Sequence, residues 1–515
     1  MYYPAKEDFL ALAGQGNLIP VTCRILADFE TPLSAYQKIR GRDEAFLFES
    51  VEGGEHLGRY SFVGCNPRAI IRQHGSRVEV IENGRVTEKY AVGGKGAEAG
   101  VGEKTVRDGL EVVSLVMSRY KAVPLPGLPR FTGGAVGFLG YEFIHDIEPV
   151  VPVPPKDDLG TPTLYFLLAD ELLIFDRAAQ TITILVNALV GPEGGAGSNA
   201  AAEAYDDAVS EIDRLVSLLE QPTEQKPVVI PLEVSSIPFD SNVTREAFYD
   251  RVLKAKEYIR AGDIIQVVGS QRFSTEVKAS PLDIYRAARS INPSPYMFLL
   301  ELEGFSLVGA SPEIHVRAED GKVEIRPIAG TRPRGATPEA DKANETELLA
   351  DPKERAEHVM LVDLARNDLG RVCEFGSVAV KDLMIIERYS HVMHIVSQVE
   401  GTLAAGKTPY DLMRATFPAG TLSGAPKIRA MQIISELEGV KRGPYGGCVG
   451  YFSFNGNLDC CITIRTALVK DGRAYVQAGG GWVNDSTPEG EYNETVNKAK
   501  AMLKAVALAE GFAKK

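Results

Sequence analysis

Two segments of the chain repeat the same spacing of acidic residues. Glu354 and Glu357 lie in DPKERAEHVMLVDLARND, and Glu491 and Glu494 lie in TPEGEYNETVNKAKAML. Residues three apart share one face of a helix, so each pair would project two carboxylates in one direction. Four converging carboxylates would repel one another unless a hard cation lay between them, and Mg²⁺ accepts oxygen ligands while keeping positions for water or an anionic substrate. The spacing therefore indicates a Mg²⁺ site, although the same pattern also occurs on solvated helix faces.

Residues near the second acidic pair have the chemistry to bind an anion. Lys498 follows Glu494 by four positions, where it could pair with that glutamate or with a substrate carboxylate. Residues 479–481 are three glycines, which let a backbone approach a ligand closely beside a helix start. Residues 417–427, FPAGTLSGAPK, offer the Thr421 hydroxyl among small residues and are a second possible anion-binding loop.

Helix-capping residues indicate which elements would position these groups. Asp351 before Pro352 and Thr487 before Pro488 each place a capping residue ahead of a proline at the first helical position. Both acidic segments should therefore be helices that begin at these prolines. Residues 244–262 show the pattern of another capped amphipathic helix, and the strand-like run IIQVVGSQRF follows it.

Composition divides the chain into three parts. Short runs of β-branched and aromatic residues separated by turn residues predict a sheet-rich region at 1–180. Residues 181–239 contain a Gly-rich stretch, a helical pattern and a polar stretch with prolines, so we expect a helix and linker. Helices and strands alternate over 240–515, which we expect to be a third part of mixed α and β structure.

Length and charge exclude several classes of protein. The 515 residues are 44% hydrophobic and 24% charged, which is typical of a chain that buries a core. The net charge of −13 supplies no positive field for phosphate backbones or anionic lipids, so we expect no nucleic-acid and no membrane partner. The first segment does not have the pattern of a signal peptide, which favours a cytoplasmic location. The chain has no CxxC pair among its six cysteines and no P-loop, dinucleotide, nucleophile-elbow or zinc-protease motif where it could work.

Longer motifs point to a family. PIAGTRPRG, EHVMLVDLARND, YSHVMH, FPAGTLSGAPK, RGPYGGCVGY, ITIRT and EYNETVNKAKAM occur in this order. Together they resemble the chorismate-utilising enzymes, and most closely their anthranilate synthase branch. The resemblance implies an α+β fold, a four-layer α/β sandwich with two antiparallel sheets. It implies a regulatory role for the region 1–180 and a chorismate-binding catalytic domain at 240–515. It also implies conversion of chorismate and ammonia to anthranilate and pyruvate with Mg²⁺ as cofactor.

The resemblance implies roles for particular residues. Glu357 and Glu494 would ligate the metal directly, while Glu354 and Glu491 would hold metal-bound waters. Glu313, in the ASPE of 310–313, would be the general acid. The other implied catalytic residues are His394 and Thr421, and the implied substrate-binding residues are Gly330, Thr331, Tyr445, Arg465, Gly479, Gly480, Gly481 and Lys498.

Two absent lysines discriminate between branches of the family. The isochorismate branch has a water-activating lysine at the position of Gln266, and glutamine cannot act as a base near neutral pH. The aminodeoxychorismate branch has a nucleophilic lysine where this chain has Ala329. Trp482 and Asn484 depart from the small residues usual after the glycines and would alter the pyruvyl pocket if Trp482 pointed inward. An aminodeoxychorismate synthase-like enzyme and an inactive tryptophan-sensing homologue are the alternatives.

Partners are also implied. No glutamine-amidotransferase motif is present, so ammonia would come from glutamine through a separate glutaminase subunit, in a hetero-oligomer. Tryptophan would act as a feedback inhibitor. Its expected pocket comprises Ser50, Asn292, Pro295, Tyr296, Met297, Phe298 and Cys461.

Overall fold

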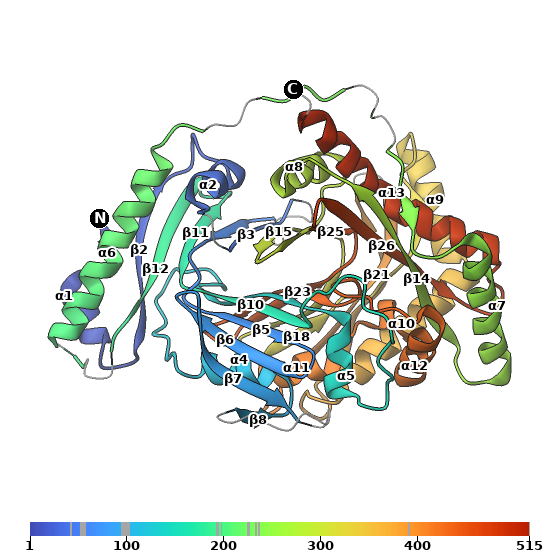
Figure 1. Ribbon diagram of the computed structural model, residues 1–515, viewed down its shortest axis with the longest axis horizontal. Helices are drawn as coiled ribbons and strands as arrows, with labels where there is room; N and C mark the ends of the chain where they lie inside the picture. The colour runs from blue at the N-terminus through green and yellow to red at the C-terminus, as the bar shows by residue number, and fades with distance from the viewer. Residues whose placement is uncertain are drawn as a thin grey trace.

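Two large sheets with helices on their outer faces make up the protein (Figure 1). The computed structural model describes residues 1–41, 44–51, 58–93, 103–191, 195–196, 198–223, 227–231, 234, 237–389 and 392–513. Within these residues each sheet has 13 strands, and every pair of named strands is antiparallel apart from β7 with β8. The expected α+β sandwich of two antiparallel sheets is confirmed.

The first sheet joins strands from both ends of the chain. Its order is β1 (Tyr2–Tyr3), β2 (Leu18–Leu26), β12 (Thr181–Leu189), β11 (Glu171–Asp176), β4 (Tyr60–Gly64), β3 (Ala45–Glu49), β15 (Tyr296–Leu302), β16 (Phe305–Ser311), β25 (Thr466–Lys470), β26 (Arg473–Trp482), β14 (Gln266–Glu276) and β13 (Asp240–Ser241), with β22 (Gly424–Ala425) paired to β14.

The second sheet is built in the same way. Its order is β19 (Ile328–Pro333), β21 (Val392–Thr402), β18 (Lys322–Ile325), β17 (Ile314–Glu319), β24 (Leu458–Ile462), β23 (Cys448–Ser453), β9 (Gly134–Leu139), β10 (Leu164–Ala169), β5 (Ile70–His74), β6 (Arg77–Glu82), β7 (Arg85–Val92) and β8 (Lys104–Val106), with β20 (Ala379–Arg388) paired to β21.

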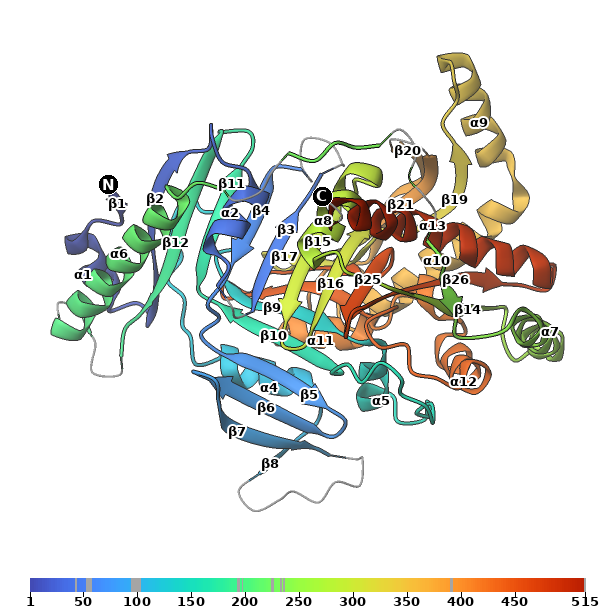
Figure 2. The ribbon, with the colours of Figure 1, turned by 45° about the horizontal axis from the view of Figure 1, so that its top comes forward.

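Helices cover the two outer faces. Those packed on the first sheet are α1 (Lys6–Leu12), α2 (Pro32–Ile39), α6 (Asn199–Leu219), α8 (Pro281–Ile291) and α13 (Pro488–Ala513). Those packed on the second sheet, or on the far end of the first, are α4 (Gly109–Met117), α5 (Ile144–Ile147), α7 (Arg245–Ala261), α10 (Pro352–Gly370), α11 (Pro409–Thr416) and α12 (Lys427–Glu438). Helix α9 (Pro338–Ala350) projects beside β19 at the edge of the molecule (Figure 2). Two short 3-10 turns are η1 (Tyr141–Phe143) and η2 (Gly420–Leu422).

Alternation along the strands produces these layers. In β11, Leu172 and Ile174 belong to the core between the two sheets, whereas Leu173 and Phe175 pack under the helices of the first sheet. Successive side chains of a strand point to opposite faces, so a strand that is apolar throughout must be covered on both sides. The buried runs that the sequence analysis assigned to strands are therefore interior strands.

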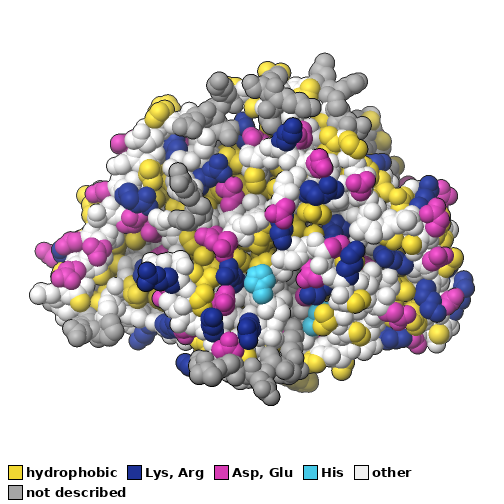
Figure 3. All heavy atoms as spheres, viewed as in Figure 1, with side chains coloured by type: hydrophobic (Ala, Val, Ile, Leu, Met, Phe, Trp, Pro, Cys, Tyr) yellow, Lys and Arg dark blue, Asp and Glu magenta, His cyan; other side chains and the backbone are white. Residues whose placement is uncertain are grey.

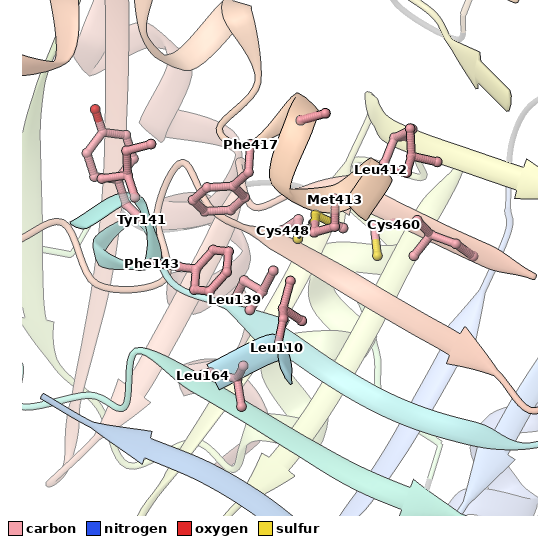
Figure 4. Close-up of a cluster of buried hydrophobic side chains, with 14 of the residues drawn as sticks. Leu110, Leu139, Tyr141, Phe143, Leu164, Leu412, Met413, Phe417, Cys448 and Cys460 are labelled. Carbon is pink, nitrogen blue, oxygen red and sulfur yellow. Dashed lines mark hydrogen bonds between the residues drawn. The ribbon is translucent and has the colours of Figure 1, made fainter. Parts of the chain in front are cut away.

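A third cluster of buried side chains joins the second sheet to its helices. Figure 4 shows Leu139 and Leu164 from the sheet beside Leu110 of α4 and Met413 of α11. The ring of Phe417 meets that of Phe143 edge-on, with centroids 5.4 Å apart. This packing fixes the end of α11, immediately before the 417–427 segment that the sequence analysis singled out.

The expected boundary at residue 181 needs correction. Residues 181–189 form β12, which pairs with β2 and β11, so the helix and linker begin only after Leu189. Strand β15 pairs with β3, and β23 pairs with β9, so both sheets combine strands from before and after the linker. Strand β12 lies between β2 and β11 in the first sheet. It is an interior strand, and its side chains are buried on both faces of the sheet apart from its two end residues, which are half-buried.

No helix within the described residues is long and apolar enough to cross a membrane. Basic and acidic side chains are interspersed over the face seen in Figure 3.

Candidate active site

The two acidic segments are helices that begin at the predicted prolines. The Oδ1 atom of Asp351 accepts a hydrogen bond from the backbone N–H of Glu354 at 3.2 Å, which caps α10. The Thr487 hydroxyl accepts one from the backbone N–H of Gly490 at 3.2 Å at the start of α13. The capping prediction is confirmed, and both pairs of carboxylates lie in the first two turns of their helices.

These helices lie in the right half of Figure 1. Their starts line a cavity of about 800 Å³. Ends of β14, β19, β21 and β26 complete its walls. Every residue predicted for metal binding, substrate binding or catalysis lines this cavity except Gly480: Glu313, Gly330, Thr331, Glu354, Glu357, His394, Thr421, Tyr445, Arg465, Gly479, Gly481, Glu491, Glu494 and Lys498. The sequence motifs are thus parts of one site, although they are spread over almost 200 residues.

The carboxylates face one another across the cavity. Burial raises the pKa of Glu357, and the charge of Glu354 adds to that rise. Burial likewise raises the pKa of Glu491 to about 7, and its Oε2 atom is buried without a hydrogen-bond partner. No three acidic, histidine or cysteine side chains of the described residues lie close enough to enclose a metal ion. Mg²⁺ commonly takes one or two protein carboxylates and completes its shell with water and substrate oxygens, so the residues present fit such an ion.

The three glycines belong to β26 and leave space for the carboxylates. A Cβ atom on Gly480 would lie 2.7 Å from Oε2 of Glu491, and one on Gly481 would lie 1.9 Å from Nε2 of Gln266. Gly480 therefore faces α13, which is why it does not line the cavity, whereas Gly479 and Gly481 do. The absence of side chains here lets the backbone of β26 form the cavity wall.

Two cations lie beside this wall. The ammonium group of Lys498 donates to the carbonyl oxygen of Gly479 at 3.0 Å and lies 2.7 Å from the carboxylate of Glu494. Arg465 has a positive φ of 51° and forms no side-chain hydrogen bond or ion pair with the described residues. Burial lowers the pKa of Arg465. An arginine that is desolvated and unpaired is suited to bind an anionic ligand.

Glu313 lies at the opposite wall, between β16 and β17. The hydroxyl of Thr421 donates to its Oε1 atom at 3.1 Å. Burial raises the pKa of Glu313 to about 8, although the Thr421 hydrogen bond lowers it in part. The carboxyl group is therefore largely protonated at neutral pH, as a general acid must be.

His394 extends from β21 between β19 and the cavity. Its Nδ1 atom lies 2.9 Å from the carbonyl oxygen of Gly330 and 3.1 Å from the hydroxyl of Thr331. A carbonyl oxygen can only accept, so Nδ1 carries the proton and Nε2 is left as an acceptor. Burial lowers the pKa of His394, which favours this neutral form.

Trp482 does not enter the cavity. Its side chain is buried in the core, where the indole meets the ring of Phe248 on α7 edge-on at 5.4 Å. It lies over Gly269 of the paired strand β14, where a Cβ atom would be 2.0 Å from the indole ring. The possibility that this residue points into the site and alters it is therefore wrong, because glycine on the neighbouring strand leaves it a place on the other face.

Some lining residues were not predicted. Lys353, Gln477, Asn493 and Asn497 also line the cavity. Asn493 and Asn497 follow Gly490 at i+3 and i+7, so the helical period could have placed them on the face of Glu494. Nothing in the sequence marks Gln477, which depends on the pairing of β26 with β14.

The predicted inhibitor residues surround a second cavity, of about 700 Å³. It is lined by Ser50, Pro295, Tyr296, Met297, Phe298 and Cys461, but not by Asn292. Asn292 follows α8, and its amide lies 3.4 Å from the hydroxyl of Ser294. The hydroxyl of Ser50 is buried and has no hydrogen-bond partner among the described residues. The two large cavities share no lining residue.

A two-sheet α+β sandwich with a cavity that joins carboxylates to cations is the framework of an enzyme for a small anionic substrate. The chain belongs to the chorismate binding enzyme family, which it matches over residues 59–504.

Several relatives are similar over nearly the full chain. Anthranilate synthase component 1 of Acetivibrio thermocellus is 48% identical over 98% of this chain and 99% of its own. The protein of that name from Pseudomonas putida is also 48% identical, with the same coverage. The crystal structure of anthranilate synthase component I from Streptococcus pneumoniae TIGR4 superimposes with a TM-score of 0.74 at 37% identity, covering 93% of this chain and 99% of that one.

Proposed function

We propose that this protein is the chorismate-converting component of an anthranilate synthase in tryptophan biosynthesis. The reaction takes chorismate and ammonia to anthranilate, pyruvate and water. The observation that carries the proposal is the single cavity, in which a protonated carboxyl group at Glu313 faces the cations Arg465 and Lys498 and two pairs of carboxylates.

Substrate binding is assigned to the cations and the glycine wall. Chorismate carries two carboxylates, and Arg465 offers a planar pair of N–H donors without a competing acid. Lys498, which donates to the carbonyl oxygen of Gly479, is assigned to the second carboxylate of chorismate. The enolpyruvyl group can approach the backbone of Gly479 and Gly481 closely, because glycine has no side chain to separate the two.

Proton transfer is assigned to Glu313 and His394. Loss of the 4-hydroxyl of chorismate as water requires a proton, which the carboxyl group of Glu313 holds at neutral pH. Neutral His394 presents an acceptor nitrogen to the cavity, suited to receive a proton when the ring becomes aromatic. Both groups are buried, and burial shifts their pKa values away from those in water.

Mg²⁺ is the cofactor we propose, held by Glu357 and Glu494, with Glu354 and Glu491 on its waters. When bound it would neutralise the carboxylates and polarise the leaving group. The unpartnered Oε2 atom of Glu491 supports this assignment.

Ammonia as the nucleophile is favoured by Ala329 and Gln266, which line the cavity without offering a nucleophilic amine or a base. Gln266 is held by a hydrogen bond from its Nε2 atom to Oε1 of Glu357, at 3.3 Å. We propose that a separate glutaminase subunit supplies the ammonia, and that tryptophan inhibits from the second cavity.

Anthranilate fluorescence tests the proposal. Purified protein with chorismate, ammonium and Mg²⁺ should release anthranilate, and chelation of the metal should stop release. A folded protein that binds tryptophan but releases nothing would instead identify an inactive sensing homologue. An aminated product that keeps its enolpyruvyl group would indicate aminodeoxychorismate chemistry.

A further inference from the structure

We propose that Arg442 is a positioning residue for the reaction: its buried guanidinium holds the turn that presents Thr421 to Glu313. The inference rests on the proposed function, since it concerns the acid of that reaction. Arg442 does not line the cavity, and its side chain is only 1% exposed.

Arg442 ties three segments together through four hydrogen bonds. Its Nε and Nη2 atoms donate to the two carboxylate oxygens of Glu438, at the end of α12, at 2.8 and 2.7 Å. Nη1 donates to the carbonyl oxygen of Leu422 at 2.9 Å, and Nη2 also donates to that of Val268 on β14 at 2.7 Å. A buried charged group is tolerated when its donors have hydrogen-bond partners. All three guanidinium nitrogens of Arg442 donate at least one of these hydrogen bonds.

The turn at 419–423 is fixed from both sides by this arrangement. The backbone N–H of Val268 donates to the carbonyl oxygen of Ser423 at 2.9 Å. The carbonyl oxygen of Val268 accepts a hydrogen bond from Arg442. Leu422 follows Thr421 directly, so the hydrogen bond to its carbonyl oxygen restricts the backbone turn that carries the Thr421 side chain. That hydroxyl is the group that donates to Glu313.

The same guanidinium also supports a second wall of the cavity. It lies between the rings of Tyr141 and Tyr445, with its central carbon 4.6 and 5.6 Å from their centroids. Tyr445 lines the cavity, whereas Tyr141 is buried behind it. Arg442 therefore contacts three residues of the cavity wall, Val268, Leu422 and Tyr445, without lining the cavity itself.

Glu438 is itself fixed to the strand that carries Gln266. Its Oε1 atom accepts from the backbone N–H and the hydroxyl of Ser270 at 2.9 and 2.8 Å. A lysine at 442 would keep the positive charge for Glu438, but its three donors have no planar fork and cannot reach Glu438, Leu422 and Val268 together.

The test compares Arg442→Lys with Thr421→Val and with their combination. We expect Arg442→Lys to lower kcat for ammonium-dependent anthranilate formation roughly tenfold, with a much smaller change in KM for chorismate. The fall of kcat at high pH should move upward, to the pH seen in Thr421→Val, because the Thr421 hydrogen bond lowers the pKa of Glu313. The double variant should show no further shift if Arg442 acts through Thr421.

Arg414→Lys is the matched control. Arg414 forms a largely buried pair with Asp108, at 2.7 Å, and neither residue lines the cavity. This variant should keep the wild-type pH profile even if its melting temperature falls. A wild-type pH profile in Arg442→Lys, or fully additive effects in the double variant, would overturn the assignment.

Two outcomes separate this inference from the proposed function. If the wild type and Arg414→Lys form no anthranilate, the proposed function fails, whatever Arg442 does. If Arg442→Lys does not fold, Glu438→Gln weakens the same fork while keeping its shape, and it should raise the pH of the kcat fall in the same direction. An unmoved profile in that variant would also refute the positioning role.

Discussion

At the scale of single residues, burial accounts for most of the chemistry of the site. The carboxyl group of Glu313 and the imidazole of His394 are both shifted toward their neutral forms, because the cavity wall removes water from them. Arg465 has no side-chain hydrogen bond or ion pair with the residues that the structure describes, which suits it to bind an anionic ligand. The cavity thus holds an acid, an acceptor and an anion-binding cation without direct ion pairs among the three.

The first prediction is a loss of activity at high pH. Since the pKa of Glu313 is raised to about 8, its acidic form is present below that value and lost as the pH rises through it. Turnover should therefore fall above about pH 8. Glu313→Gln should lower kcat by roughly 10²–10⁴-fold and remove this dependence, as measured by kcat against pH. A Gln variant that keeps the same profile would show that another group titrates.

The second prediction concerns the metal carboxylates. Glu357→Gln should lose Mg²⁺-dependent turnover without a fall in melting temperature, because the substitution removes a buried charge that neighbouring carboxylates repel. Glu489→Gln, an exposed position on α13, serves as control and should stay active. Retention of more than about a tenth of wild-type activity, a loss under about 1.4 kcal/mol, would remove Glu357 from the metal shell.

The third prediction concerns Ala329, on β19 in the cavity wall. Lysine there would place an amine near the ring, and a buried lysine loses its proton readily enough to attack. Ala329→Lys should stop ammonium-dependent anthranilate formation, and mass spectrometry should look for a chorismate adduct. Ala379→Lys, on the exposed part of β20, is the control. An unchanged ammonium-dependent rate would mean that residue 329 does not border the path of ammonia.

At the scale of elements, the sequence predicts features that depend on neighbouring residues, such as helix starts. It does not predict features that depend on which strands pair with each other. The starts of α10 and α13 follow from a cap residue and a proline, and both were predicted to the residue. The glycines at 479–481 were expected to let the backbone approach a ligand beside a helix start, and the structure places them within β26 because strand β14 pairs along them. Arg442 begins the motif RGPYGGCVGY, in which the sequence indicated a role only for Tyr445, because the partners of Arg442 come from α12, β14 and η2.

The fourth prediction tests that strand pairing. In Gly269→Ala the new Cβ atom would lie 2.0 Å from the indole of Trp482, so strand β14 or the core must shift. We expect a loss of about 1–3 kcal/mol in the free energy of unfolding, as for other overpacked cores, measured by urea denaturation. Gly370→Ala, at the end of α10 with open space around its Cβ position, should not destabilise the protein. Equal stabilities of the two variants would contradict the placement of Trp482.

At the scale of the whole molecule, the two cavities are separate but connected through the second sheet. Asp459 and Cys461 of β24 line the second cavity. The next residue, Ile462, donates its backbone N–H to the carbonyl oxygen of Glu313 at 3.0 Å and accepts from the hydroxyl of Ser311 at 2.6 Å. A shift of β24 would therefore reach the acid of the active site directly. The backbone contact continues the pairing of β24 with β17, so the sequence alone, which does not give the strand order, does not show it.

The last prediction uses this connection. Feedback inhibition requires that tryptophan and chorismate favour different states of the molecule. Strand β24 lines the second cavity and is bonded through Ile462 to the backbone of Glu313, which lines the first. Ser50 lines the second cavity with an unpartnered hydroxyl, so Ser50→Phe should fill the space that the inhibitor needs and leave the first cavity intact. Tryptophan titration of anthranilate formation should then show weaker inhibition at unchanged uninhibited activity. A variant that stays active and as sensitive as the parent would place the inhibitor elsewhere and leave the contact of β24 with Glu313 without a regulatory role.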